Sequence, residues 1–224
     1  MNRHISFSEG EYYHIYNRGV EKRDVFMDAG DYLRFQRMIF YANGNRPIVY
    51  KLISTDEFSG AKRGEPLCSV GVYVLMPNHF HLLVRAQNDH GITEFMRKLT
   101  TGYTMYFNKK YSRVGPLFQG PFKAEHVGRD EYLKYLFAYI HLNPVKLIDS
   151  TWKEQGIKNP EKTKTYLERY RYSSMPEWQG KRRPEASIIS QGDFPEYFEN
   201  EDQFDSYINN WLNFQGDTLE YSND

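Results

Sequence analysis

The chain has 224 residues, 17% of them aromatic, and its 29 Lys and Arg residues balance 29 Asp and Glu residues. Its mean hydropathy is −0.74, and no apolar stretch approaches the roughly 20 residues that a membrane span needs. The lone Cys68 excludes an internal disulfide and a cysteine-based zinc site. With no signal-peptide pattern at the start, we expect a cytoplasmic protein without a membrane segment.

The first 150 residues predict alternating strands and helices. Residues 11–20 are rich in Tyr, Ile and Val and predict a strand, and residues 28–42 have helical spacing with Asp28 or Asp31 as N-cap. Residues 48–53 could form a strand before a polar loop at 54–67. Further strands are expected at 69–76, 79–85 and 122–127, and further helices at about 92–110 and 130–142. Apart from 48–53, the order predicts an α+β, ferredoxin-like βαββαβ fold, an antiparallel sheet with helices on one face.

The signals weaken after residue 150. Residues 165–175 predict a short helix and turn, and residues 201–214 have the apolar spacing of an amphipathic helix. We therefore divide the chain into a domain at 1–150 and a mainly helical, acidic extension at 151–224.

The charges are unevenly distributed along the chain. Residues 1–150 carry 20 Lys and Arg against 15 Asp and Glu, whereas residues 151–224 carry 9 against 14. A basic stripe without acids runs through Arg97, Lys98, Lys109, Lys110, Arg113 and Lys123. It is interleaved with the rings of Tyr103, Tyr106, Phe107, Tyr111, Phe118 and Phe122. Cations that neutralise phosphates and rings that stack on bases are typical of a single-stranded nucleic-acid groove. A solvated basic helix with its apolar side in the core is the alternative.

The most specific chemical pattern is His79-Phe80-His81. Residues i and i+2 of a strand point to the same face, so both imidazoles are expected to project together. They would supply half of a metal site. The alternative is two unrelated surface histidines or one buried structural histidine.

The helix at 130–142 presents a second set of polar groups. Its core stripe contains Leu133, Leu136 and Ile140, and Tyr139 lies about 100° from the middle of that stripe. Asn143 follows one turn later on the same side. A tyrosine and an amide beside a histidine pair would offer a nucleophile and a third ligand, although Tyr139 could equally be a half-buried aromatic residue.

Two segments together resemble a known family. Residues 73–84 (YVLMPNHFHLLV) and 139–146 (YIHLNPVK) resemble the single-tyrosine HUH transposases, most closely the REP-associated tyrosine transposases. Supporting segments lie at Tyr13–Ile15, Asn17–Gly19, Tyr103–Asn108 and Gly115–Gly120, with a fainter echo at Tyr172–Ser174.

The resemblance implies a metal-dependent transposase that nicks and joins single-stranded or hairpin DNA through a 5′-phosphotyrosine intermediate. It implies that Tyr139 is the nucleophile, that His79 and His81 hold Mg²⁺ or Mn²⁺, and that Asn143 completes the metal site where relatives use Gln. Residues 1–150 would be the catalytic domain of a nucleoid-associated homodimer. The expected DNA contacts are Arg18, Arg97, Lys98, Tyr103, Lys109, Lys110, Arg113 and Lys123.

Two other functions remain open at this point. The first is a nucleic-acid-binding protein that keeps the fold but has lost the reaction. The second is a metal hydrolase that combines the histidines with a carboxylate. It is disfavoured, because no Asp or Glu lies at ligand spacing near either motif, and the nearest, Asp89, Glu125 and Asp130, belong to other elements. His141, His126 and water are the candidate proton acceptors for Tyr139.

Overall fold

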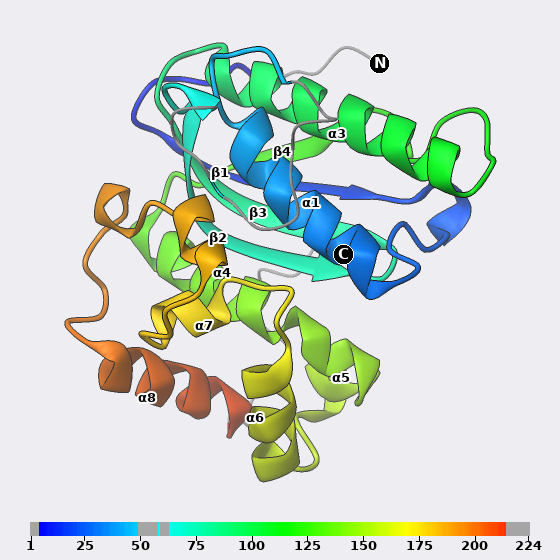
Figure 1. The fold of residues 1–224 in the computed structure, drawn as a ribbon. Coiled ribbons are helices and arrows are strands. Elements are labelled where there is room, and N and C mark those ends of the chain that lie inside the picture. The colour runs from blue at the N-terminus through cyan, green and yellow to red at the C-terminus, as the bar shows by residue number, and fades with distance from the viewer. Residues whose placement is uncertain (1–4, 49–57, 59–62, 214–224) are drawn as a thin grey trace.

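The computed structural model describes residues 5–48, 58 and 63–213. Within them, one antiparallel sheet has the strand order β2-β3-β1-β4. Its strands are β1 (Tyr12–Arg18), β2 (Cys68–Met76), β3 (His79–Ala86) and β4 (Lys123–His126). Helices α1 (Ala29–Ala42) and α3 (Gly91–Lys110) lie together on one face of the sheet (Figure 1). This confirms the predicted ferredoxin-like α+β fold. The strand expected at 48–53 falls, beyond Ile48, outside the described residues.

Local sequence signals explain where α1 begins and which side chains of β1 face each side of the sheet. The side chain of Asp28 accepts a hydrogen bond from the backbone N–H of Asp31 and caps α1. Along β1, Tyr13 and Ile15 are buried in the core beneath α1 and α3. The alternate residues, among them His14, therefore face the other side of the sheet.

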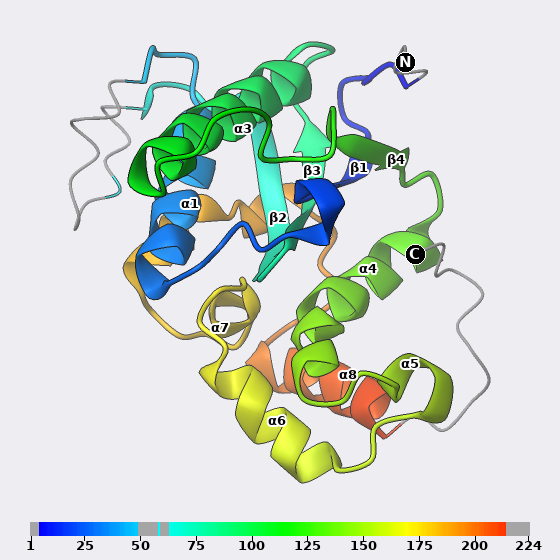
Figure 2. The same ribbon diagram turned by 90° about the vertical axis from the view of Figure 1, so that its right-hand side faces the viewer.

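Helix α4 (Asp130–Leu142) covers this second face (Figure 2). It packs on the sheet through a second apolar cluster that includes Val74 and Leu83 from the strands and Leu136 and Ile140 from the helix. The chain then continues as helices α5 (Trp152–Gln155), α6 (Pro160–Arg169), α7 (Met175–Trp178) and α8 (Glu201–Leu212). Short 3₁₀ helices are η1 (Val20–Lys22), η3 (Asn143–Leu147), η4 (Pro184–Ile188) and η5 (Gln191–Asp193).

The C-terminal helices enclose the far side of α4. Ala138 and Leu142 of α4 share a third apolar cluster with Phe204 and Ile208 of α8. The amphipathic helix expected at 201–214 is present as α8. The helix expected at 165–175 begins earlier, as α6, because Asn159 accepts a hydrogen bond from the Lys162 N–H and Pro160 fits the first turn. A boundary at residue 150 stays a prediction.

A segment far along the chain pairs with the outer edge of β2. The N–H of Leu75 donates to the carbonyl of Tyr172 at 2.9 Å, and the N–H of Ser174 donates to the carbonyl of Tyr73 at 3.0 Å. The faint Tyr172–Ser174 motif therefore covers an edge strand that would otherwise present unpaired backbone groups. In the part of the chain described here, no helix has the length and apolar character to cross a membrane.

Candidate active site

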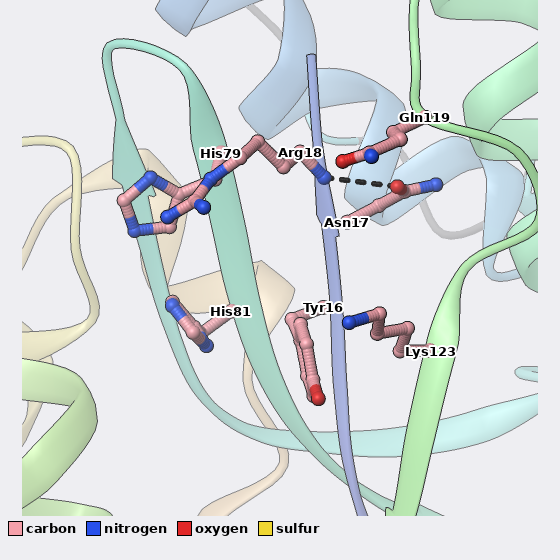
Figure 3. A pocket seen from close by; sticks show the side chains of 7 residues that line it. All are labelled: Tyr16, Asn17, Arg18, His79, His81, Gln119 and Lys123. Carbon is pink, nitrogen blue, oxygen red and sulfur yellow. Dashed lines mark hydrogen bonds between the residues drawn. The ribbon is translucent and has the colours of Figure 1, made fainter. Parts of the chain in front are cut away.

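The predicted histidine pair stands at the start of β3, directly after a tight turn. His79 is half-buried and His81 is 2% exposed. Both line a pocket of about 210 Å³ at the face of the sheet that α4 covers. Its other lining residues are Tyr16, Asn17, Arg18, Gln119 and Lys123 (Figure 3). The strand geometry thus brings the two imidazoles to one pocket, as their spacing predicts.

The two nitrogens of each imidazole have different surroundings. Nδ1 of His79 lies 2.6 Å from Oδ1 of Asn78. An amide oxygen can only accept, so Nδ1 of His79 carries a proton, and whenever the ring is neutral its lone pair lies on Nε2. Nε2 of His81 is buried and has no hydrogen-bond partner among the described residues. Burial, followed by the nearby His14 and His79, holds the pKa of His81 well below its usual range, so this ring is neutral near pH 7.

Tyr139 of α4 lies against the histidines within the same chain. Its ring is 6% exposed and stands edge-to-face against the ring of His81, with centroids 5.8 Å apart. The ring of His14 lies 5.9 Å away in the same kind of contact. The ammonium of Lys153, on α5, lies 4.5 Å from the centroid of the Tyr139 ring. One chain therefore assembles the tyrosine, the two predicted histidines and a nearby cation.

Asn143 has a visible role at the end of the tyrosine helix. Pro144 has no N–H, and the backbone N–H of Asn143 donates to the carbonyl of Ile140 instead of continuing the α-helical pattern. The carbonyl of Tyr139 then receives its hydrogen bond from the Asn143 side chain, Nδ2 to O, at 2.9 Å. Asn143 is 2% exposed and is not among the residues that line the histidine pocket. The structure thus engages this amide in capping, and its role as a metal ligand stays a prediction.

The predicted DNA-binding cations lie in two separate places. Arg18 and Lys123 line the histidine pocket. The others lie on α3 or just after it, and α3 covers the opposite face of the sheet (Figure 1). They are Arg97, Lys98, Lys109, Lys110 and Arg113. Two of the five are engaged in ion pairs, Lys110 with Asp31 at 2.7 Å and Lys98 with Glu94 at 2.8 Å. The contiguous stripe of the sequence is therefore divided by the sheet.

Most of the aromatic residues in that stripe are buried in the hydrophobic core. Tyr103 is fully buried, and its hydroxyl donates to the carbonyl of Val25 at 2.5 Å. Phe107, Phe118 and Phe122 are also buried. The prediction that Tyr103 contacts DNA is corrected on this ground, because a ring inside the core offers no face to a base. For α3, the structure matches the alternative of a solvated basic helix whose apolar side packs inward.

The other candidates do not reach Tyr139 or the histidine pair. His141 is fully buried on the far side of α4, where its Nε2 contacts the hydroxyl of Ser174 at 2.8 Å. His126 is exposed and pairs with Glu11 at 2.7 Å. Of the three carboxylates considered for a hydrolase, only Glu125 comes close to the site. It contacts His14 rather than His79 or His81, with Oε2 3.8 Å from Nδ1 of His14.

The sequence and the fold are both similar to those of known proteins. The profile of the family Y1_Tnp, described as Transposase IS200 like, matches residues 64–143. The chain resembles the IS200-like transposases. The profile match confirms the family resemblance inferred from the motifs at residues 73–84 and 139–146. The solved structure of a REP-associated tyrosine transposase bound to a REP hairpin has the same fold, with a TM-score of 0.55 and 12% identity over 99% of this chain and 95% of that chain. No curated protein matches this sequence.

The stretch shared with the IS200-like transposases runs from just before β2 to the end of α4. It contains His79, His81 and Tyr139, which the structure brings together. His14 and Lys153 lie outside it, on β1 and α5. The sequence motifs include the Tyr13–Ile15 segment but assign neither His14 nor Lys153 to the site, because only the strand register and the folding of α5 onto α4 bring them there.

Proposed function

We propose that this protein is a metal-dependent, transposase-like enzyme that nicks and rejoins single-stranded DNA through a tyrosine. The observation that carries the proposal is the contact between Tyr139 and His81 at the edge of a pocket lined by His79, Arg18 and Lys123. A nucleophile, two imidazole nitrogens that can bind a metal and two cations form a set of groups suited to transferring a phosphodiester to a protein side chain. The likeness of residues 64–143 to IS200-like transposases supports the same reaction.

The pocket fits a divalent metal on chemical grounds. The imidazoles of His79 and His81 share one face of β3, and Nε2 of His81 is a buried nitrogen without a hydrogen-bond partner among the described residues. A bound Mg²⁺ or Mn²⁺ would polarise a non-bridging oxygen of the scissile phosphate as a Lewis acid. Two nitrogen ligands suit Mn²⁺ better than Mg²⁺, so we expect the higher activity with Mn²⁺. Asn143 remains the predicted third ligand.

The chain's own side chains position and stabilise the reacting groups. Arg18 and Lys123 would bind the remaining phosphate oxygens, and Gln119 adds a side-chain donor. The hydroxyl oxygen of Tyr139 attacks phosphorus and loses its proton to solvent. The bond from phosphorus to the 3′ oxygen breaks, and that oxygen takes up a proton. The positive charge of Lys153 beside the ring favours the phenolate that develops on attack.

The products explain why no external energy source is needed. They are a DNA strand joined through its 5′ phosphate to Tyr139 and a strand with a free 3′-OH. Attack of a 3′-OH on the phosphotyrosine reverses the reaction and rejoins DNA, because the covalent link retains the phosphodiester energy. The partner we propose is single-stranded or hairpin DNA of the nucleoid, and the transposase of the same fold was solved with a REP hairpin. A homodimer is also proposed, although one chain already holds the tyrosine beside the histidines.

The test uses a pool of hairpin oligonucleotides with randomised single-stranded flanks, labelled at the 3′ end. The label then stays on the strand that becomes attached to the protein. With Mn²⁺, the wild-type protein should give a labelled band that withstands denaturation, and Tyr139→Phe should abolish it. Tyr135→Phe is the matched control, since that ring lies one turn earlier on α4 and 5.7 Å from Tyr139. An adduct that persists in Tyr139→Phe would exclude Tyr139 as nucleophile.

The alternative is a DNA-binding protein that has lost the reaction. It has one observation in its favour: among the residues that the structure describes, no three His, Cys, Asp or Glu side chains form a group that could hold a metal. The same observation counts against the carboxylate-based hydrolase. Retention of the pool on the protein without any adduct in Mn²⁺ would favour the binding protein over the enzyme.

A further inference from the structure

Three side chains from three strands form a line that ends at the histidine pocket. Cα pairing places Glu125 of β4 directly opposite His14 of β1. Oε2 of Glu125 lies 3.8 Å from Nδ1 of His14, and Nε2 of His14 lies 2.9 Å from Nδ1 of His81. The two imidazoles are 4% and 2% exposed, respectively. A carboxylate, an imidazole and a second imidazole therefore follow one another toward the pocket.

The contact between the two imidazoles holds one proton, which can sit on either ring. If Nε2 of His14 carries it, Nδ1 of His14 turns a lone pair toward the Glu125 carboxylate. Nε2 of His81 then carries a buried N–H, and no described residue accepts from it. If Nδ1 of His81 carries the proton, the N–H of His14 lies on Nδ1, 3.8 Å from the Glu125 carboxylate, a charge contact longer than a hydrogen bond. In that case Nε2 of His81 presents a lone pair. Each arrangement leaves one buried N–H without a hydrogen-bond partner, on Nε2 of His81 in the first and on Nδ1 of His14 in the second. The negative carboxylate attracts an N–H on Nδ1 of His14 and repels a lone pair at the same position, so the second arrangement is favoured.

The carboxylate at the outer end of the line is itself held in place. The hydroxyl of Tyr16 donates to Oε1 of Glu125 at 2.8 Å, and the hydroxyl of Tyr132 donates to Oε2 at 3.4 Å. Tyr16 is also the direct cross-strand partner of His81. The sheet register thus fixes the acceptor, the two imidazoles and the tyrosine that orients the acceptor.

We propose that His14 and Glu125 are positioning residues that keep the proton on Nδ1 of His81 and direct its Nε2 lone pair to the metal. This inference rests on the proposed metal site of His79 and His81. His79 reaches the same state by a separate route, through Asn78. Partners that orient a histidine ligand through its other nitrogen raise metal affinity by a factor of roughly 10 to 100.

The first measurement needs no metal. Long-range ¹H–¹⁵N spectra of the histidine-labelled protein identify which ring nitrogen is protonated, and the His81 signals are assigned by their loss in His81→Gln. The wild type should show the proton on Nδ1 of His81. His14→Phe removes the acceptor while keeping a ring, and the proton should move to Nε2. An unchanged His81 signal in a folded His14→Phe protein would overturn the proposal.

The second measurement is Mn²⁺ affinity by calorimetry. We expect a loss of roughly 10-fold or more in His14→Phe and a smaller loss in Glu125→Gln, which keeps the shape of the side chain but weakens the acceptor. Glu11→Gln is the matched control, since it removes the Glu11–His126 pair, a second carboxylate–imidazole contact, between β4 and the residue before β1, that does not touch His81. Equal Mn²⁺ affinity in all four proteins would overturn the proposal.

The two measurements separate this inference from the proposed function. A wild type that binds no Mn²⁺ but carries its proton on Nδ1 of His81 would contradict the metal site and leave the positioning of His81 by His14 and Glu125 intact. A wild type that binds Mn²⁺ but carries the proton on Nε2 of His81 in the metal-free state would contradict only the positioning role of His14 and Glu125. If His14→Phe does not fold, Glu125→Gln still tests both readouts, because its side chain is 40% exposed and lies at the outer end of the line.

Discussion

The cap at the end of the tyrosine helix can be tested by removing one hydrogen bond. The Asn143 side chain donates to the carbonyl of Tyr139 at 2.9 Å, in a site where Asn143 is 2% exposed. Asn143→Ala leaves that carbonyl without its donor, and water has little access to replace it. The expected loss in free energy of unfolding is about 1–3 kcal/mol. For a chain of this size that corresponds to a lowering of Tm by roughly 2–12 °C.

The chain offers a matched control for this substitution. Asn213, at the end of α8, makes the same contact, from Nδ2 to the carbonyl of Asn209 at 2.8 Å, but it is exposed. Water can replace the lost donor there, so Asn213→Ala should cost about 0.5 kcal/mol or less. Urea denaturation of both variants measures the difference. If Asn143→Ala costs no more than Asn213→Ala, the capping argument is wrong.

A second variant separates capping from metal binding at the same position. Asn143→Asp keeps an oxygen ligand but replaces the donor with an acceptor that faces the Tyr139 carbonyl. Capping predicts a stability loss at least as large as that of Asn143→Ala, whereas a ligand role predicts Mn²⁺ affinity that is retained or increased. Denaturation and calorimetry on this one protein therefore report on each role independently.

Two further predictions concern the two faces of the sheet and one buried histidine. Tyr103→Phe should lower the free energy of unfolding by about 1–2 kcal/mol and leave DNA affinity unchanged, because the Tyr103 hydroxyl donates to a carbonyl inside the core. Arg18→Ala should weaken DNA binding and reduce the slope of log affinity against log salt concentration by about 1, because Arg18 lines the histidine pocket. Equal DNA affinities of these two variants would contradict this assignment of the two faces. Burial lowers the pKa of His141 from 6.5 to about 3. As the pH falls below 6.5, His141 therefore binds a proton in the unfolded state but not in the folded state. This difference alone should lower the free energy of unfolding by about 2 kcal/mol between pH 7 and pH 5. Denaturation at both pH values should show a smaller loss of stability in His141→Gln than in the wild type. An equal loss in the two proteins would show that His141 is not the source of the pH dependence.

The elements and the histidine pair follow directly from local sequence patterns. Alternation along a strand predicts that His79 and His81 share a face, and the structure places both in one pocket. The Asp28 cap likewise predicts the start of α1, and the missing N–H of Pro144 accounts for the end of α4. Such features depend on neighbours a few residues away, which is why sequence alone suffices for them.

Features that depend on distant packing were not predictable in this way. His14 reaches His81 only through the pairing of β1 with β3, a contact across 67 positions. Tyr139 flanks the core stripe of its own helix, yet α4 is buried on nearly all sides because α8 covers it. The basic stripe is continuous in sequence, but α3 carries most of it to the face opposite the histidines. Helical periodicity alone cannot say which side of a sheet a helix will cover.

The most direct test of the central claim is to identify the amino acid that becomes attached to DNA. Wild-type protein incubated with Mn²⁺ and the hairpin pool would be digested with nuclease and protease, and the modified peptide sequenced by mass spectrometry. The account predicts a nucleotide joined through its 5′ phosphate to Tyr139, in the peptide that ends α4. A nucleotide on Tyr135, Tyr132 or any other residue, or one joined through a 3′ phosphate, would contradict it.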